Sequence, residues 1–231
     1  SSFPFTYDVG RDLLAVRDLV YFHKLSLIGQ TSGQGGFFYG PWWYWILAIP
    51  FFLSGGNPTF IALFIAFTGI AAVLISYWWG ISFLDRTSGL FLAGLFAVAP
   101  VFISSTTQIW NPNLLILLTL LVLIFLSRIN KLNFGQLVIF GFLTMLLAEL
   151  ELIFGAVFII GLFLALLLCQ RKIFFSKKIL PVILGGIIVE LPRAIFELRH
   201  NFLQTKVLLG MFSQHTVGHV DKLLRLKIFA E

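Results

Sequence analysis

Six apolar runs separated by short polar gaps constrain this chain more than any other feature. They occupy roughly residues 59–80, 88–105, 113–127, 134–150, 152–169 and 179–196. The chain is 59% hydrophobic and only 11% charged, whereas a soluble domain carries about 25% charged residues. Helices satisfy their backbone hydrogen bonds internally, so such runs can cross a hydrocarbon core about 30 Å thick. We therefore predict an all-α fold, a polytopic transmembrane helical bundle with about six spans.

The polar gaps alternate in charge. Two basic residues lie in gap 128–131 and four in gap 171–178, whereas gap 104–113 has no charge and gap 149–151 holds two glutamates. Short cytoplasmic loops of membrane proteins are enriched in lysine and arginine. We therefore expect the basic gaps to be cytoplasmic and the others extracytoplasmic. The same gaps account for most of the net charge of +6, so membrane lipids are expected partners and nucleic acid is not.

The segment before these runs is expected to lie on the membrane surface. Residues 9–28 alternate apolar and charged side chains in the manner of an amphipathic helix, too charged to cross a bilayer. The aromatic stretch 39–45 leads into an apolar run that ends at Ser54. From Pro41 to Ser54 a helix rises only about 21 Å, which is short of the bilayer core. We predict a re-entrant or surface helix here; if it spans instead, the N-terminus is cytoplasmic.

These observations divide the chain into three regions. Residues 1–58 form a first extracytoplasmic loop with an amphipathic and an aromatic juxtamembrane helix, and residues 59–196 form the transmembrane module. Residues 197–231 form an extracytoplasmic segment. Because the chain begins at Ser1 and its last residues resemble mid-chain sequence, we interpret it as a fragment that lacks a C-terminal part.

Asp8, Arg11 and Asp12 are the first candidate site. Residues three and four apart are neighbours on a helix, so the three side chains share one face if the backbone is helical. Two carboxylates and a guanidinium are typical of a site that binds a phosphate and deprotonates a hydroxyl. The structural alternative stays open: Asp8 caps a helix that starts at Val9, and the other two side chains form its solvated first turn.

Further candidates follow the expected extracytoplasmic gaps. Trp110-Asn-Pro-Asn113 opens a helix, with Asn111 as its cap and Pro112 at its first position. Arginines at the end of the last run can bind a phosphate bidentately or contact anionic headgroups. If the aromatic helix does not span, the extracytoplasmic face gathers the following side chains: Asp8, Arg11, Asp12, Trp110, Asn111, Glu149, Glu151, Glu190, Arg193, Arg199 and His200.

Several spaced motifs together resemble bacterial integral-membrane glycosyltransferases. They are Phe5-Thr-Tyr-Asp-x-x-Arg-Asp12, Gly40-Pro41 before a Trp/Tyr-rich helix, Ser54-Gly-Gly-Asn-Pro58, Trp110-Asn-Pro-Asn113 and Leu191-Pro-x-x-x-Phe-x-Leu-Arg-His200. The chain is similar to the GT-C fold, in the branch of the protein O-mannosyltransferases and the lipid A aminoarabinose transferase.

The resemblance implies a many-helix catalytic module in the cell (inner) membrane. It implies a polyprenyl-phosphate sugar donor and an acidic residue of the first extracytoplasmic loop, matching Asp8, as base on the acceptor hydroxyl. It departs at Tyr39-Gly40-Pro41, where some relatives carry a lysine before the proline. The first span and the C-terminal portion of such enzymes are also missing.

These inferences lead to one functional hypothesis with two alternatives. Asp8 is the expected catalytic base of an inverting transfer to a lipid, glycan or protein acceptor. Binding of the donor phosphate or the acceptor is expected from Arg11, Asp12, Trp110, Asn111, Arg199 and His200. A divalent metal is left open, because two carboxylates beside one arginine do not define a metal site. The alternatives are a transporter or flippase of a lipid-linked or anionic substrate, and a non-catalytic membrane fragment.

Overall fold

The computed structural model describes residues 5–32 and 37–213, and within them the fold is all-helical. One isolated bridge between Thr31 and Phe38 is the sole β-type pairing in these ranges. The elements in chain order are α1 (Tyr7–Phe22), α2 (Trp42–Ser54), α3 (Pro58–Phe83), α4 (Arg86–Val98), α5 (Pro100–Thr106), η1 (Asn111–Leu114), α6 (Leu115–Ser127), η2 (Ile129–Lys131), α7 (Phe134–Leu150), α8 (Leu152–Cys169), α9 (Arg171–Phe174), α10 (Ile179–Arg199) and α11 (Leu203–Ser213). The predicted all-α class is confirmed. Of the predicted segment 197–231, residues 214–231 lie outside the described ranges.

Fewer helices than predicted are long enough to cross a membrane. By length and composition three qualify among the described residues, namely α3, α8 and α10, or four if the bent pair α4–α5 forms one span. The bend of 63° falls at Ala99, where the extended backbone precedes Pro100. Residues 111–127 and α7 are shorter, and a helix of 17 residues rises about 26 Å. Helix length therefore does not support the predicted count of six spans.

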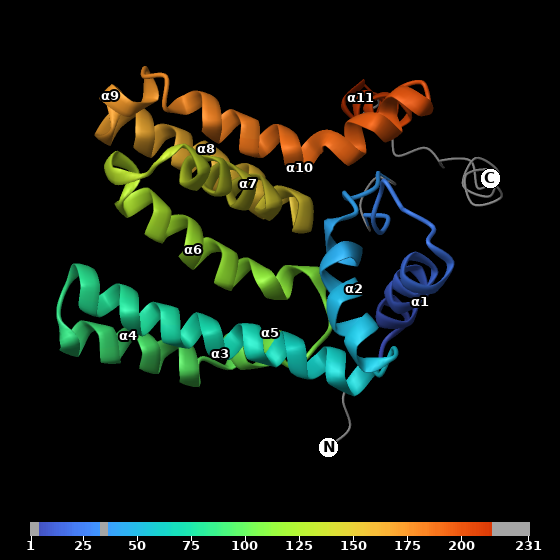
Figure 1. Cartoon of the computed structure of the whole chain (residues 1–231), viewed down its shortest axis with the longest axis horizontal. Coiled ribbons are helices and arrows are strands. Elements are labelled where there is room, and N and C mark those ends of the chain that lie inside the picture. The colour runs from blue at the N-terminus through green and yellow to red at the C-terminus, as the bar shows by residue number, and fades with distance from the viewer. Residues whose placement is uncertain (1–4, 33–36, 214–231) are drawn as a thin grey trace.

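The long helices lie side by side, and their connections collect at two ends (Figure 1). One end, here called the basic end, comprises residues 84–86, 127–133 and 170–178, which carry seven basic residues and one acidic residue. At the opposite end α2 runs across the tips of the other helices, so we call it the α2 end. The short, transverse α2 agrees with the prediction of a helix that does not span.

Helix α1 packs along α2 through an amphipathic face. Its buried side chains are Val9, Asp12, Leu13 and Val16, spaced by three and four residues. The helix begins at Tyr7 and ends at Phe22, earlier than the predicted 28. Its N-cap is Thr6, whose hydroxyl accepts from the backbone N–H of Val9 at 3.4 Å. The alternative in which Asp8 caps a helix from Val9 is therefore wrong; Asp8 lies inside the first turn.

Two glycines allow α7 and α10 to approach each other backbone to backbone. A Cβ atom built on Gly141 would lie 1.9 Å from the carbonyl oxygen of Val182, and one on Gly185 would lie 2.0 Å from that of Val138. These distances are well inside van der Waals contact, so neither position accepts a side chain without separating the helices. In lipid, helices associate through such close contacts of small residues.

We expect Gly185→Ala to destabilise the protein by about 1–3 kcal/mol, the usual cost of overpacking. The matched control is Gly186→Ala, where the added methyl meets only Met145 at an ordinary 3.9 Å. Alanine favours helix over glycine by up to about 1 kcal/mol, so this control should be neutral or stabilising. Thermal unfolding in detergent measures both variants, and equal losses would exclude the α7–α10 contact as the cause.

Candidate functional site

A connected polar cluster joins α1 to the start of α2. The Asp12 side chain is only 3% exposed, and its Oδ2 accepts a hydrogen bond from Trp43 Nε1 at 2.8 Å. Its Oδ1 binds Arg11, at 2.9 Å to Nε and 2.8 Å to Nη2. Arg11 Nη1 in turn holds Asp8 Oδ1 at 2.9 Å. The order Trp43–Asp12–Arg11–Asp8 thus runs from the protein interior to the surface.

The two carboxylates of this cluster have different environments. Burial raises the pKa of the Asp12 carboxyl, and the Arg11 guanidinium and Trp43 indole only partly offset this effect. Burial also raises the pKa of the neighbouring Tyr44 phenol, and the charge of Asp12 adds to the shift. The Asp8 side chain, by contrast, is 59% exposed. Asp8 is therefore the carboxylate that an external molecule can reach, whereas Asp12 fixes the guanidinium behind it.

A second polar cluster lies where α7 turns into α8. Glu149 is 1% exposed, and its Oε1 lies 3.0 Å from Arg193 Nη2 on α10. Arg193 also donates to Glu190, from Nε at 3.0 Å and from Nη2 at 2.6 Å. The backbone of Gly40 lies directly against Glu149, because a Cβ on Gly40 would lie 1.2 Å from Glu149 Oε2. This cluster therefore joins α7, α10 and the segment that leads into α2.

Asn111 attaches the start of α6 to the same turn. Its side-chain amide donates to the backbone carbonyl of Leu150, next to Glu149. The N-cap position of η1 is Trp110, and no side chain caps it. The interpretation of Asn111 as a helix cap is therefore wrong, although Pro112 does lie in the first turn. Nearby, the Tyr39 hydroxyl lies 3.5 Å from Glu151 Oε1.

Arg199 and His200 lie at the C-terminal end of α10, both exposed. The His200 ring stacks on Phe196 with 4.1 Å between centroids, and its Nδ1 is 2.9 Å from the Phe196 carbonyl oxygen. Phe196 also packs against Phe38 at 6.3 Å. The end of α10 thus contacts the segment that leads into α2, while the Arg199 guanidinium forms no ion pair within residues 5–32 and 37–213.

The structure brings the predicted site residues to the α2 end in separate groups. Asp8, Arg11 and Asp12 form one group, and Asn111 and its exposed neighbour Trp110 belong to the α7–α8 turn. Among the described side chains, no hydrogen bond, ion pair or ring contact joins Asp8 to Trp110 or to the end of α10. Within the same ranges, no three His, Cys, Asp or Glu side chains gather as metal ligands. Asp8 and Asp12 instead share Arg11.

Sequence reasoning missed the partners of two buried carboxylates. Asp12 has the same helical spacing as Val9, Leu13 and Val16, so it lies on the apolar face of α1. A charged residue on that face was the signal that Asp12 has a buried partner. For Glu149 the signal was a carboxylate at the end of an apolar run. The identity of its partner, Arg193, required the contact between α7 and α10.

Comparison of the chain with known protein families, with characterised proteins and with solved structures finds no match.

Proposed function

We propose that this chain is the catalytic module of a membrane glycosyltransferase that moves a sugar from a polyprenyl-phosphate donor to an acceptor hydroxyl at the α2 end. The observation that carries the proposal is the exposed Asp8 carboxylate. Arg11 binds this carboxylate, and the buried Asp12–Trp43 pair fixes the Arg11 guanidinium. A general base must be accessible and held in a defined position, and both conditions apply to Asp8.

The proposed reaction is a single inverting displacement. The acceptor oxygen forms a bond to the anomeric carbon of the sugar while the bond from that carbon to the phosphate oxygen breaks. The leaving phosphate keeps the electron pair of the broken bond, and Asp8 takes the proton from the acceptor hydroxyl. General-base assistance of this kind contributes about 10²–10⁴-fold to a rate.

The negative charge that develops on the leaving phosphate needs a cation. Arg11 is already bound by two carboxylates, so Arg199 is the better candidate, because its exposed guanidinium has no carboxylate partner within the described residues. His200 lies beside it with Nδ1 occupied by the Phe196 carbonyl, which leaves Nε2 for a ligand. At the same end, Trp110 provides an exposed aromatic ring. Asn111 fixes the segment that leads into α6 through its hydrogen bond to the Leu150 carbonyl.

The proposal includes a multi-pass topology in the cell (inner) membrane, with a GT-C-like bundle. In it α3, the bent pair α4–α5, η1 continued by α6 (residues 111–127), α7, α8 and α10 make six crossings. An even number of crossings returns the chain to its starting side, which agrees with α1 and α11 both lying at the α2 end (Figure 1). The basic end carries seven basic residues and one acidic residue, so the positive-inside rule makes it cytoplasmic and the α2 end extracytoplasmic.

Cysteine labelling tests this topology and with it the proposed site. We expect a membrane-impermeant maleimide to label Asp8→Cys in intact cells in a Cys169→Ser background. Lys172→Cys, the matched position at the basic end, should react only after permeabilisation. Labelling of both positions from the same side would contradict the topology, and a cytoplasmic Asp8 would exclude the mechanism.

A further inference from the structure

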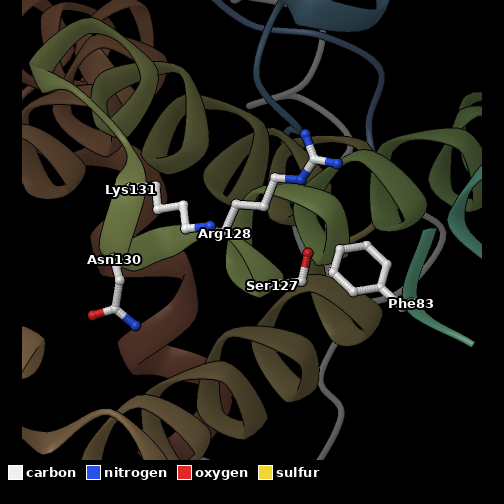
Figure 2. A pocket seen from close by; sticks show the side chains of 5 residues that line it. All are labelled: Phe83, Ser127, Arg128, Asn130 and Lys131. Atoms are coloured by element: carbon white, nitrogen blue, oxygen red, sulfur yellow. The ribbon is translucent and has the colours of Figure 1, made fainter.

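A pocket of about 410 Å³ opens at the basic end, away from the residues of the proposed transfer (Figure 2). Phe83 lines it from the end of α3, and the chain from α6 into η2 supplies the rest of the wall: Ser127, Arg128, Asn130 and Lys131. Figure 2 shows the Phe83 ring beside the Ser127 hydroxyl, with the two cationic side chains on the same wall. The pocket therefore combines two positive charges with an apolar edge.

Neither cation of the pocket has a carboxylate partner in the part of the chain that the structure describes. Arg128 and Lys131 form no ion pair among the described residues. The one acidic residue of the basic end is Asp85, and its Oδ1 accepts from the backbone N–H of Ser88 at 2.7 Å as the cap of α4. The pocket thus has an uncompensated positive charge, which an anion can neutralise.

Two aromatic rings of α3 flank the Arg128 guanidinium. Its central carbon lies 4.9 Å from the ring centroid of Trp78 and 5.9 Å from that of Phe83. Both rings are on α3 and are more than a third exposed. Partly exposed aromatic rings at the end of a membrane helix mark the interface between hydrocarbon and water. An arginine that lies over aromatic rings keeps its N–H donors available for oxygen ligands.

Contacts with the next helices hold the pocket wall in place. Asn130 Nδ2 donates to Gln170 Oε1 at 3.2 Å, and Lys178 Nζ donates to the Asn130 carbonyl at 2.8 Å. Both bonds join η2 to the α8–α10 connection, so the wall is held on that side. A fixed site loses less entropy on binding than a mobile one.

We propose that this pocket binds the phosphate headgroup of an anionic membrane lipid. Arg128 and Lys131 supply the charge, and the guanidinium can bind two phosphate oxygens. The exposed apolar side chains of α3 that lead away from the pocket, such as Leu74 and Ile81, give the acyl chains a surface to follow. The site is independent of the proposed transfer, which takes place at the other end of the bundle.

Lipid titration of the purified protein in nanodiscs tests the proposal, with native mass spectrometry as readout and phosphatidylglycerol in phosphatidylcholine as probe. The variant is Arg128→Gln with Lys131→Gln. Losing charge-assisted hydrogen bonds to a bound phosphate costs about tenfold or more in affinity, so we expect at least about tenfold weaker retention of phosphatidylglycerol. The matched control, Arg171→Gln with Lys172→Gln, removes the same charge at the same end outside the pocket and should lose less than about fivefold.

Three outcomes would overturn the proposal. Equal losses in the two double variants would indicate a diffuse basic surface instead of a site. Displacement of bound phosphatidylglycerol by millimolar inorganic phosphate or glycerol phosphate would assign the pocket to a soluble phosphate. If the double variant does not fold, the single variant Lys131→Gln replaces it, because it keeps Arg128 and its ring contacts. Unchanged retention of phosphatidylglycerol in this single variant would also exclude the site.

Discussion

Replacing Asp8 with asparagine is expected to lower the rate of sugar transfer by about 100-fold or more, the scale of losing a general base. Asparagine has nearly the same size but cannot accept the acceptor proton. Because Thr6, and not Asp8, caps α1, the substitution leaves the cap intact. It removes one exposed partner of Arg11, which keeps Asp12. Release of polyprenyl phosphate from a polyprenyl-phosphate sugar by the protein in membranes measures the effect.

Two variants on the same helix control this experiment. Asp18 forms an exposed pair with Arg17 at 2.8 Å, much as Asp8 pairs with Arg11. Asp18→Asn removes a similar exposed ion pair at another place on the helix. It should therefore leave the transfer rate unchanged if the role of Asp8 depends on its place in the site. Asp12→Asn should slow transfer less than Asp8→Asn, because Asp12 positions Arg11 and does not face the acceptor. Near-normal turnover of a folded Asp8→Asn protein would exclude Asp8 as the base, and lipid movement without phosphate release would favour the transporter alternative.

Hydropathy predicts the helical segments of this chain but not how many reach across a membrane. Each of the six apolar runs is helical, since a helix is how such a run satisfies its backbone in lipid. The number of membrane spans also depends on breaks within the helices, which an average hydropathy over a run does not detect. Pro100 bends one run, and η1 replaces the first turn of another. Both interruptions involve a proline, whose missing N–H breaks the regular helical ladder.

In the candidate site, too, contacts within one helix could be predicted from the sequence, whereas contacts between helices could not. The spacing of Asp8, Arg11 and Asp12 predicted their common helix face, because neighbours on a helix follow from sequence separation alone. The Trp43 bond to Asp12 and the ion pair between Glu149 and Arg193 cross helices. Which of several nearby polar side chains meet depends on helix packing, which local spacing does not encode.

Replacing Arg193 with methionine is expected to cost about 3–5 kcal/mol of folding stability, the usual result of leaving a buried charge unpaired. Methionine fills much of the volume but cannot bind the carboxylate of Glu149, a residue that is 1% exposed. The loss should extend to α2, because Gly40 lies against that carboxylate. Unfolding in detergent, followed by tryptophan fluorescence, measures it. Arg199→Met is the control, since this exposed arginine near the end of the same helix has no ion pair among the described residues.

Replacing Glu149, the other member of the ion pair, should reduce folding stability less than replacing Arg193. In Glu149→Gln the guanidinium of Arg193 keeps Glu190, with which it forms hydrogen bonds at 3.0 and 2.6 Å, and no charge is left buried without a partner. The double variant Glu149→Gln, Arg193→Met should therefore be more stable than Arg193→Met alone. A coupling of about 0.5–3 kcal/mol is usual for residues in contact. Additive losses would show that the two side chains act independently, and the ion pair would then not be what holds α7 and α10 to the start of α2.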